Sequence, residues 1–275
     1  MRAPTFLPRP PGSPIRLFRL ACWCRALLLV LVTPLLTAPS LAAGSIVSYG
    51  AADAPEIILM LSMSPNNVDV TGVPHRALGQ WLALLADGAR VRLTIRPVTD
   101  KERLDDLMRN PDTCSLNYAR LPVREKNVNW LYKMKRDRIV FVTRANDPFN
   151  GRLADLLSVA SGQVGAPSGI YRTILDSRGI RHIVVDDHRQ LAQMVDAGHP
   201  RFGLMLDSSL SAPEIKALKL RVVAELPEVG FWLACSHAMP LDVRLRISTV
   251  LYTPAAQRLH REATSARTAA ADAEP

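Results

Sequence analysis

The chain has 275 residues, with 34 Lys and Arg, 25 Asp and Glu and four Cys, and its net charge is +9. Five of the arginines and none of the acids lie within residues 1–43, so the remaining chain carries 29 basic and 25 acidic side chains, a net charge of +4. A charge this small argues against a nucleic-acid-binding protein, which normally displays a concentrated basic surface. One short basic run occurs at 133–138, and we expect it to form a solvated turn.

Residues 1–43 have the pattern of a secretory signal peptide. The arginines form a cationic beginning, the apolar run ALLLVLVTPLL follows at 26–36, and small residues follow at Ser40, Ala42 and Ala43. The apolar run is too short for a membrane-spanning helix, which takes about 20 apolar residues. We therefore expect the signal peptide to be removed and the mature protein to be periplasmic or secreted, with no stable membrane insertion. An uncleaved membrane anchor is the alternative.

Alternating strands and helices are predicted in the first half of the mature chain. Strands are predicted where apolar residues run continuously or alternate at period two, and helices where they recur every three to four positions behind a capping pattern. The predicted elements are, in order, a strand at 56–62, a helix at 74–88, a strand at 91–97, a helix at 99–110 and a strand at 138–143. This order predicts a mostly parallel sheet covered by helices.

A second group of strands and helices follows by the same criteria. Helices are predicted at 153–160, 171–177 and 187–198, from 211 and from 241, and strands at 163–166, 181–185, 202–206, 221–225 and 231–235. Residues 263–275 are rich in Ala, Thr, Asp and Glu and have no apolar face, so we expect a disordered tail.

The segment around Arg124 resembles a short segment of the periplasmic solute-binding proteins of family 3. In this chain Arg124 is followed six residues later by the aromatic Trp130 and then by a strand. The turn at Ser168 and Gly169 is similar to the one with which those proteins open their second lobe. Asp207 follows the strand at 202–206, where the family has an aspartate. The likeness covers most of residues 55–255.

The resemblance implies a two-lobed α/β fold of the periplasmic-binding-protein type, and it looks closest to a divergent, poorly characterised branch. Each lobe would contain a mostly parallel sheet flanked by helices, and two crossing segments would join the lobes. Lobe 1 would comprise residues 50–141 and the returning segment 231–262, and lobe 2 would comprise 142–230.

The resemblance also implies a ligand site. Arg124 would bind a ligand carboxylate, with Asn117 and Tyr118 close by in lobe 1. Ser168 and Gly169 would contact the ligand from lobe 2, where main-chain N–H groups at a helix start can bind an anion. Asp207 would bind a ligand ammonium group. The alternatives are a surface arginine in an ion pair for Arg124 and a turn or cap residue for Asp207.

The chain departs from the family pattern in three ways. Leu121 replaces an expected Thr, Ile170 replaces an expected Ser or Thr, and Asn117 and Ala119 stand where Ser is expected. The two hydroxyl donors that would share a carboxylate with Arg124, at positions 121 and 170, are therefore missing. Either the ligand is not a free amino acid, or Arg124 and the Asn117 amide bind most of it.

Cys114 and Cys235 are the two cysteines beyond the signal peptide. In a fold like that of family 3 their two segments lie side by side, and disulfides persist outside the cytoplasm. The resemblance therefore implies a Cys114–Cys235 disulfide. Two unconnected buried thiols are the alternative.

An enzyme is not expected, because the sequence has no GxGxxG, P-loop or HExxH pattern. His182 and His188 do not have metal-ligand spacing, and we expect no cofactor and no metal. The predicted function is an exported solute-binding protein that closes around a small polar ligand, amino-acid-like or an organic acid, for uptake or sensing. Its partner would be the permease of an ABC transporter or a sensor kinase. The alternative is an envelope-associated structural or interaction module that kept the fold and lost its ligand.

Overall fold

The computed structural model describes residues 47–62, 67, 73–98 and 100–273. Contacts divide the chain into Met1–Ala43 and Gly44–Pro275, and the fold described below belongs to the second of these units. The predicted signal peptide, 1–43, lies outside the described residues. Within the described ranges, no helix is both long enough and apolar enough to cross a membrane.

The first sheet has six strands in the order β1-β3-β2-β4-β11-β5. Their bounds are β1 (Ser48–Tyr49), β2 (Glu56–Ser62), β3 (Arg92–Val98), β4 (Thr113–Ala119), β5 (Val128–Asp137) and β11 (Val229–Ser236). β2 is parallel to β3 and β4, whereas β11 runs antiparallel to both β4 and β5. The returning strand β11 is therefore inserted between two strands that precede it in the sequence.

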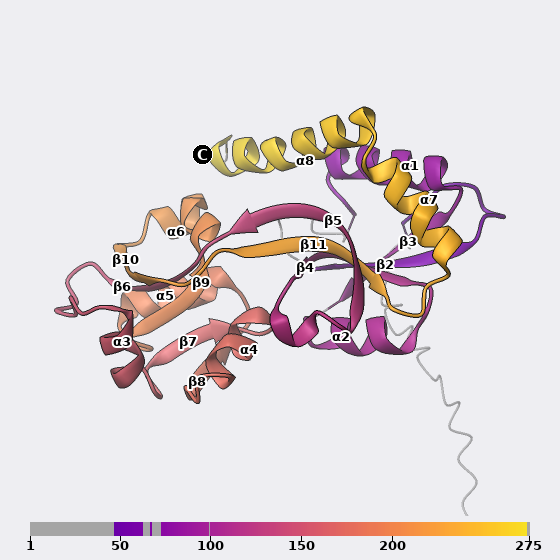
Figure 1. The fold of residues 1–275 in the computed structure, drawn as a ribbon. Coiled ribbons are helices and arrows are strands. Elements are labelled where there is room, and N and C mark those ends of the chain that lie inside the picture. The colour runs from indigo at the N-terminus through magenta and orange to yellow at the C-terminus, as the bar shows by residue number, and fades with distance from the viewer. Residues whose placement is uncertain (1–46, 63–66, 68–72, 99, 274–275) are drawn as a thin grey trace, which may run out of the picture. The chain divides into compact units, whose positions relative to one another are not determined.

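Helices cover both faces of the first sheet (Figure 1). α1 (Arg76–Ala89), α7 (Leu241–Leu251) and α8 (Pro254–Ala273) lie on one face, and α2 (Asp100–Arg109) lies on the other. In β2, Leu59 and Leu61 pack with the residues of α1, whereas Met60 packs with Leu107 of α2. The strand is apolar from Ile57 to Leu61 because both of its faces are buried.

The second sheet has five strands in the order β10-β6-β9-β7-β8. Their bounds are β6 (Ile139–Arg144), β7 (Val164–Pro167), β8 (His182–Val185), β9 (Phe202–Leu206) and β10 (Leu220–Glu225). The helices are α3 (Leu153–Val159), α4 (Ile170–Asp176), α5 (His188–Ala197) and α6 (Pro213–Lys216). Leu156 and Leu175, from α3 and α4, pack with Phe141 on one face, while Leu191 of α5 packs with Val140 on the other.

The chain crosses from the first sheet to the second at Arg138, between β5 and β6, and returns through residues 226–228, between β10 and β11. The predicted lobe limits, 141/142 and 230/231, lie a few residues further along the chain. We use "lobe 1" and "lobe 2" below for the two sheets with their helices.

Two predicted elements differ from the structure. The basic run at 133–138 is not a turn, because all but its last residue belongs to β5, and Lys133, Lys135, Arg136 and Asp137 pair with β11. Met134 is buried, and the Lys133 and Lys135 ammonium groups lie over the rings of Trp232 and Phe231. The tail predicted at 263–275 is helical as far as Ala273, since its many alanines favour helix strongly.

Cys114 and Cys235 form a disulfide bond, as predicted. The two residues face each other in the antiparallel pairing of β4 with β11, and their Cα atoms are 3.9 Å apart. Cys114 lies near the beginning of β4, whereas Cys235 lies near the end of β11. The bond thus ties the outgoing part of lobe 1 to its returning part.

Asp147 and Arg201 form an ion pair beside the second sheet. Nε and Nη2 of Arg201 donate to the two carboxylate oxygens of Asp147 at 2.8 and 2.9 Å, and the main-chain N–H of Phe149 donates to Asp147 Oδ1 at 2.9 Å. The Asp147 side chain is only 3% exposed. The hydrogen bond from Arg201 is the main cause that lowers the pKa of Asp147.

This ion pair predicts a pH dependence of stability. The pKa of Asp147 is lower in the folded protein than in the unfolded chain, where it is about 3.9, so its contribution is present above about pH 4 and is lost as the pH falls further. We expect Asp147→Asn to lower the free energy of unfolding by about 1.5–3 kcal/mol at neutral pH. The loss of stability on acidification should also become shallower than in the wild type.

Urea denaturation at a series of pH values measures both effects. Asp53→Asn changes an exposed aspartate and is the matched control, which should follow the wild-type curve. An Asp147→Asn variant that keeps the wild-type acid slope would contradict the assignment.

Candidate ligand-binding site

Arg124 lies at the end of a short 3-10 turn, η1 (Pro122–Arg124), which follows β4. Its Nη1 donates to the main-chain oxygen of Ala119 at 3.4 Å, and its Cζ lies 4.6 Å from the centre of the Tyr118 ring. No Asp or Glu of the described ranges forms an ion pair with this guanidinium. The side chain is therefore oriented by a ring and a carbonyl, and its positive charge is not neutralised by a carboxylate.

The ring of Tyr118 lies against the guanidinium of Arg124. Tyr118 is 2% exposed, and its ring stacks on Trp130 of β5 with the ring centres 5.8 Å apart. Asn117, one residue earlier, has a φ of +54° and donates from Nδ2 to Oδ1 of Asn67 at 3.4 Å. Asn tolerates this left-handed conformation better than most residues. Tyr118 and Arg124 are thus in contact at the end of β4, whereas the Asn117 amide contacts Asn67.

The predicted lobe 2 contacts lie between β7 and α4. Ser168 is half-buried, and Gly169 has φ +93° and ψ −125°, a conformation that requires glycine. The next residue, Ile170, begins α4 and is 6% exposed.

Leu121 and Ile170 belong to one buried apolar cluster, which also contains Ala119 and Phe231 from lobe 1 and Phe141 from lobe 2. We call it the interlobe cluster. Leu121 is 9% exposed, and it immediately precedes the turn that carries Arg124. The interlobe cluster therefore brings η1 and the Ser168–Gly169 turn to the same side of the molecule. It also buries the two positions at which hydroxyl donors are missing.

Asp207 lies elsewhere, at the first crossing segment. Nε and Nη2 of Arg138 donate to its Oδ2 at 3.1 and 2.6 Å, and Nη1 of Arg138 donates to Glu225 at 3.0 Å. These contacts raise the pKa of Arg138, chiefly through Asp207. The carboxylate of Asp207 is already paired with a cation, and no contact joins it to Arg124 within the described part of the chain.

A polar cluster that the sequence did not indicate lies at the carboxyl ends of the lobe 2 strands. The hydroxyl of Tyr171 is 2.6 Å from Nε2 of His188, and Oγ of Ser209 is 3.2 Å from Nδ1 of the same ring. These side chains come from α4, α5 and the 3-10 turn η2 (Asp207–Ser211) that follow β7, β8 and β9. Nowhere in the described ranges do three or more His, Cys, Asp or Glu side chains gather as metal ligands.

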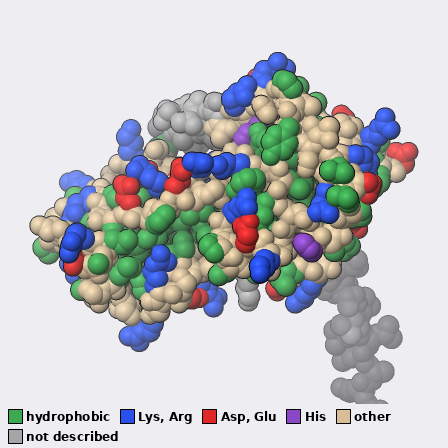
Figure 2. Space-filling model, viewed as in Figure 1, with side chains coloured by type: hydrophobic (Ala, Val, Ile, Leu, Met, Phe, Trp, Pro, Cys, Tyr) green, Lys and Arg blue, Asp and Glu red, His purple; other side chains and the backbone are tan. Residues whose placement is uncertain are grey.

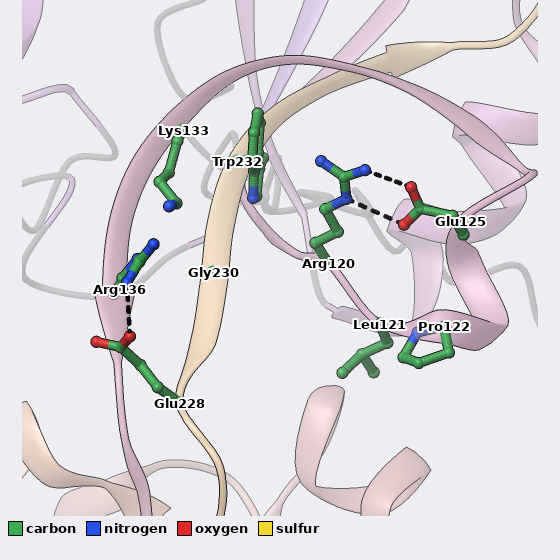
Figure 3. A pocket seen from close by; sticks show the side chains of 9 residues that line it. All are labelled: Arg120, Leu121, Pro122, Glu125, Lys133, Arg136, Glu228, Gly230 and Trp232. Carbon is green, nitrogen blue, oxygen red and sulfur yellow. Dashed lines mark hydrogen bonds and ion pairs between the residues drawn. The ribbon is translucent and has the colours of Figure 1, made fainter.

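A pocket of about 660 Å³ lies on lobe 1 and is lined by none of the predicted site residues (Figure 3). Figure 2 shows basic and acidic side chains next to one another across the middle of the face where β5 and β11 run in Figure 1. The lining residues are Arg120, Leu121, Pro122, Glu125, Lys133, Arg136, Glu228, Gly230 and Trp232. They come from η1 and its neighbours, β5, and β11 with the crossing segment before it.

No family model matches this chain, and no curated protein matches it in sequence. Solved structures do match it. A histidine kinase sensor domain with similarity to periplasmic binding proteins superposes with a TM-score of 0.64 at 14% identity, covering 78% of this chain and 96% of that one. The GluR0 ligand-binding core from Nostoc punctiforme in complex with L-glutamate gives a TM-score of 0.63 at 14% identity, covering 76% and 98%.

A mutant of ArgBP from T. maritima gives a TM-score of 0.61 at 16% identity, covering 76% of this chain and 95% of that one. This chain has the periplasmic-binding-protein fold. The match confirms the predicted two α/β lobes joined by two crossing segments, and the low identity agrees with a divergent branch. The prediction that each sheet is mostly parallel is wrong: both sheets are mixed, because β11 in lobe 1 and β6 in lobe 2 are antiparallel to both of their neighbours. These periplasmic-binding-protein-like neighbours are binding proteins and sensor domains.

Proposed function

We propose that this chain is an exported solute-binding protein that closes around a small polar ligand held between its lobes, with Arg124 bound to a ligand carboxylate. The observation that carries the proposal is the guanidinium of Arg124. It is half-buried, oriented by Tyr118 and Ala119, and without an ion-pair partner in the part of the chain described. A cation held in this way has hydrogen-bond donors available for an anion.

The surroundings of Arg124 favour an organic acid over an amino acid. Asp207, the predicted ammonium contact, is paired with Arg138, so an ammonium group would have to compete with a guanidinium. Leu121 and Ile170 have no hydroxyl to offer a second carboxylate oxygen. We propose that the Asn117 amide, Ser168 and the main-chain N–H of Gly169 provide the remaining polar contacts.

The proposed mechanism is a hinge closure rather than catalysis. Ligand binding would shift an equilibrium between open and closed lobes, and the two crossing segments would absorb the change in backbone angles. In the periplasm, the permease of an ABC transporter or a sensor kinase would recognise the closed form. Uptake and sensing share this mechanism and differ only in the partner.

Arg124→Gln should weaken ligand binding and leave the fold intact. The wild type should gain thermal stability with at least one organic acid, because a ligand that binds the folded state stabilises it by mass action. Loss of a charge-assisted hydrogen bond, worth about 1.5–3 kcal/mol, should weaken the affinity roughly 10- to 150-fold. A thermal-shift screen with amino acids, polyamines and organic acids, followed by calorimetry, measures both quantities.

Arg178→Gln is the matched control, because Arg178 also donates to a single main-chain oxygen, that of Ile174 at 3.1 Å, and is exposed. It should bind ligand as the wild type does. Undiminished binding in Arg124→Gln, together with a lower melting temperature without ligand, would assign Arg124 a structural role instead.

A second candidate function is an envelope-associated module that kept the fold and lost its ligand. The interlobe cluster favours it, since Leu121 and Ile170 fill with apolar groups the two positions where the family has donors. The same screen separates the candidates. A wild-type protein that no compound of any of the three classes stabilises supports the module and removes the solute-binding proposal.

A further inference from the structure

The lobe 1 pocket has a specific arrangement of charge. Nε of Arg120 donates to Oε2 of Glu125 at 3.0 Å and its Nη2 donates to the other oxygen, while Nη1 of Arg136 donates to Glu228 at 3.2 Å. Both acids of the lining are thus paired with arginines. The hydrogen bond from Arg120 lowers the pKa of Glu125, so this pair stays charged at neutral pH.

Lys133 is the third cation in the pocket lining, after Arg120 and Arg136. It forms no ion pair with any residue that the structure describes, and its Nζ lies 5.9 Å from the centre of the Trp232 ring. Three cations and two carboxylates line the pocket, which leaves one positive charge in excess, located on Lys133.

Trp232 provides a second unused donor. Figure 3 shows its indole between Lys133 and Arg120, and the guanidinium carbon of Arg120 is 4.8 Å from the ring centre. The two cations occupy the faces of the ring, so a ligand reaches the indole at its edge. Nε1–H lies on that edge and has no acceptor among the described residues.

Gly230 keeps this edge open. A Cβ atom at position 230 would come within 2.9 Å of Trp232 Nε1 and within 3.7 Å of Cε of Lys133. A Cβ atom would therefore crowd the indole N–H, whereas its distance from the lysine stem is an ordinary van der Waals contact. Leu121 and Pro122, from the other side of the same pocket, offer apolar surface.

We propose that this pocket is a second ligand site, which binds a small organic monocarboxylate. The ammonium of Lys133 and the Nε1–H of Trp232 hold the carboxylate, and the carbon skeleton lies against Leu121 and Pro122. A single negative charge matches the single excess positive charge of the lining. The apolar side of the pocket selects an organic acid over a bare inorganic anion. The site does not include Arg124 and does not depend on the function proposed above.

The test follows the indole N–H of Trp232 by two-dimensional proton–nitrogen NMR, with Trp232→Phe to assign the signal. Acetate, butyrate, benzoate and inorganic phosphate are the probes, each titrated into the mature protein. The signal should shift with the carboxylates, most strongly with butyrate or benzoate, and little with phosphate. Lys133→Gln should weaken the affinity roughly tenfold or more.

Lys126→Gln removes an exposed lysine outside the pocket and should change the affinity less than twofold. Arg124→Gln should also leave this titration unchanged, which separates the pocket from the site around Arg124. Gly230→Ala should abolish the response while the protein stays folded by circular dichroism. No shift of the wild-type signal, an equal response to phosphate, or wild-type affinity in Lys133→Gln would each overturn the proposal.

Discussion

Replacing Cys114 and Cys235 by alanine should lower the free energy of unfolding by up to about 4–5 kcal/mol. The bond spans 121 residues of sequence, and a cross-link of this length removes about that much chain entropy from the unfolded state. Because the unfolded chain of the variant is less restricted, the slope of its urea transition should also rise. Both positions are buried, so alanine is preferred to serine, which would bury a hydroxyl.

The wild-type protein treated with a reductant is the comparison that involves no substitution. Its urea midpoint should be close to that of the double variant. The single variants Cys114→Ala and Cys235→Ala should each lose nearly as much free energy of unfolding as the double variant does. A loss below about 1 kcal/mol in the double variant would contradict this prediction, because it would mean that the bond contributes little to the free energy of unfolding. Ligand binding between the lobes should survive, because neither cysteine lies beside the proposed contacts.

The second large effect is expected at the interlobe cluster. Leu121→Ala and Ile170→Ala should each lower the free energy of unfolding by about 2–3 kcal/mol, the low end for buried aliphatic residues. If the two side chains stabilise each other across the lobes, the double variant should lose less than the sum, by about 0.5–3 kcal/mol. Urea denaturation of the wild type, both single variants and the double variant gives this coupling energy.

Leu241→Ala, at a leucine that is 60% exposed on α7, is the control and should change stability by no more than about 0.5 kcal/mol. Strict additivity of Leu121→Ala and Ile170→Ala would show that each residue stabilises only its own lobe. A clear coupling would mean that part of the cost of opening the lobes comes from separating apolar side chains.

Much of the fold could be predicted because its local patterns agree with its tertiary structure. The apolar run at β2 is a strand buried on both faces, and the Asp187 side chain caps α5 by accepting from the Gln190 N–H. The pairing of Cys114 with Cys235 followed from the family resemblance, since nothing local links residues so far apart. The run at 133–137 was misread because its lysines lie over aromatic rings that only β11 supplies.

Less of the candidate site than of the fold could be predicted from the sequence. Asp207 and Arg138, which form an ion pair, are 69 positions apart in the sequence, and no local pattern in the sequence predicts such a contact. The lobe 1 pocket depends on the same kind of distant contact, because Arg120, Lys133 and Trp232 come from three separate segments. The roles given to Arg124, Asn117, Tyr118, Ser168 and Gly169 stay predictions, and the structure adds the stack on Tyr118 and the absence of a described ion-pair partner for Arg124.

The position of β11 between β4 and β5 has a consequence for the order in which the lobes can be completed. During synthesis β4 and β5 are made first. β11, which pairs with both of them, begins only at Val229, long after β5 has ended at Asp137. All five strands of the second sheet are made in that interval. The lobe that starts later in the sequence can therefore be finished earlier, while the first waits with two unpaired strand edges, which readily pair with other chains. The residues from Val229 onward therefore complete lobe 1, and with it the fold.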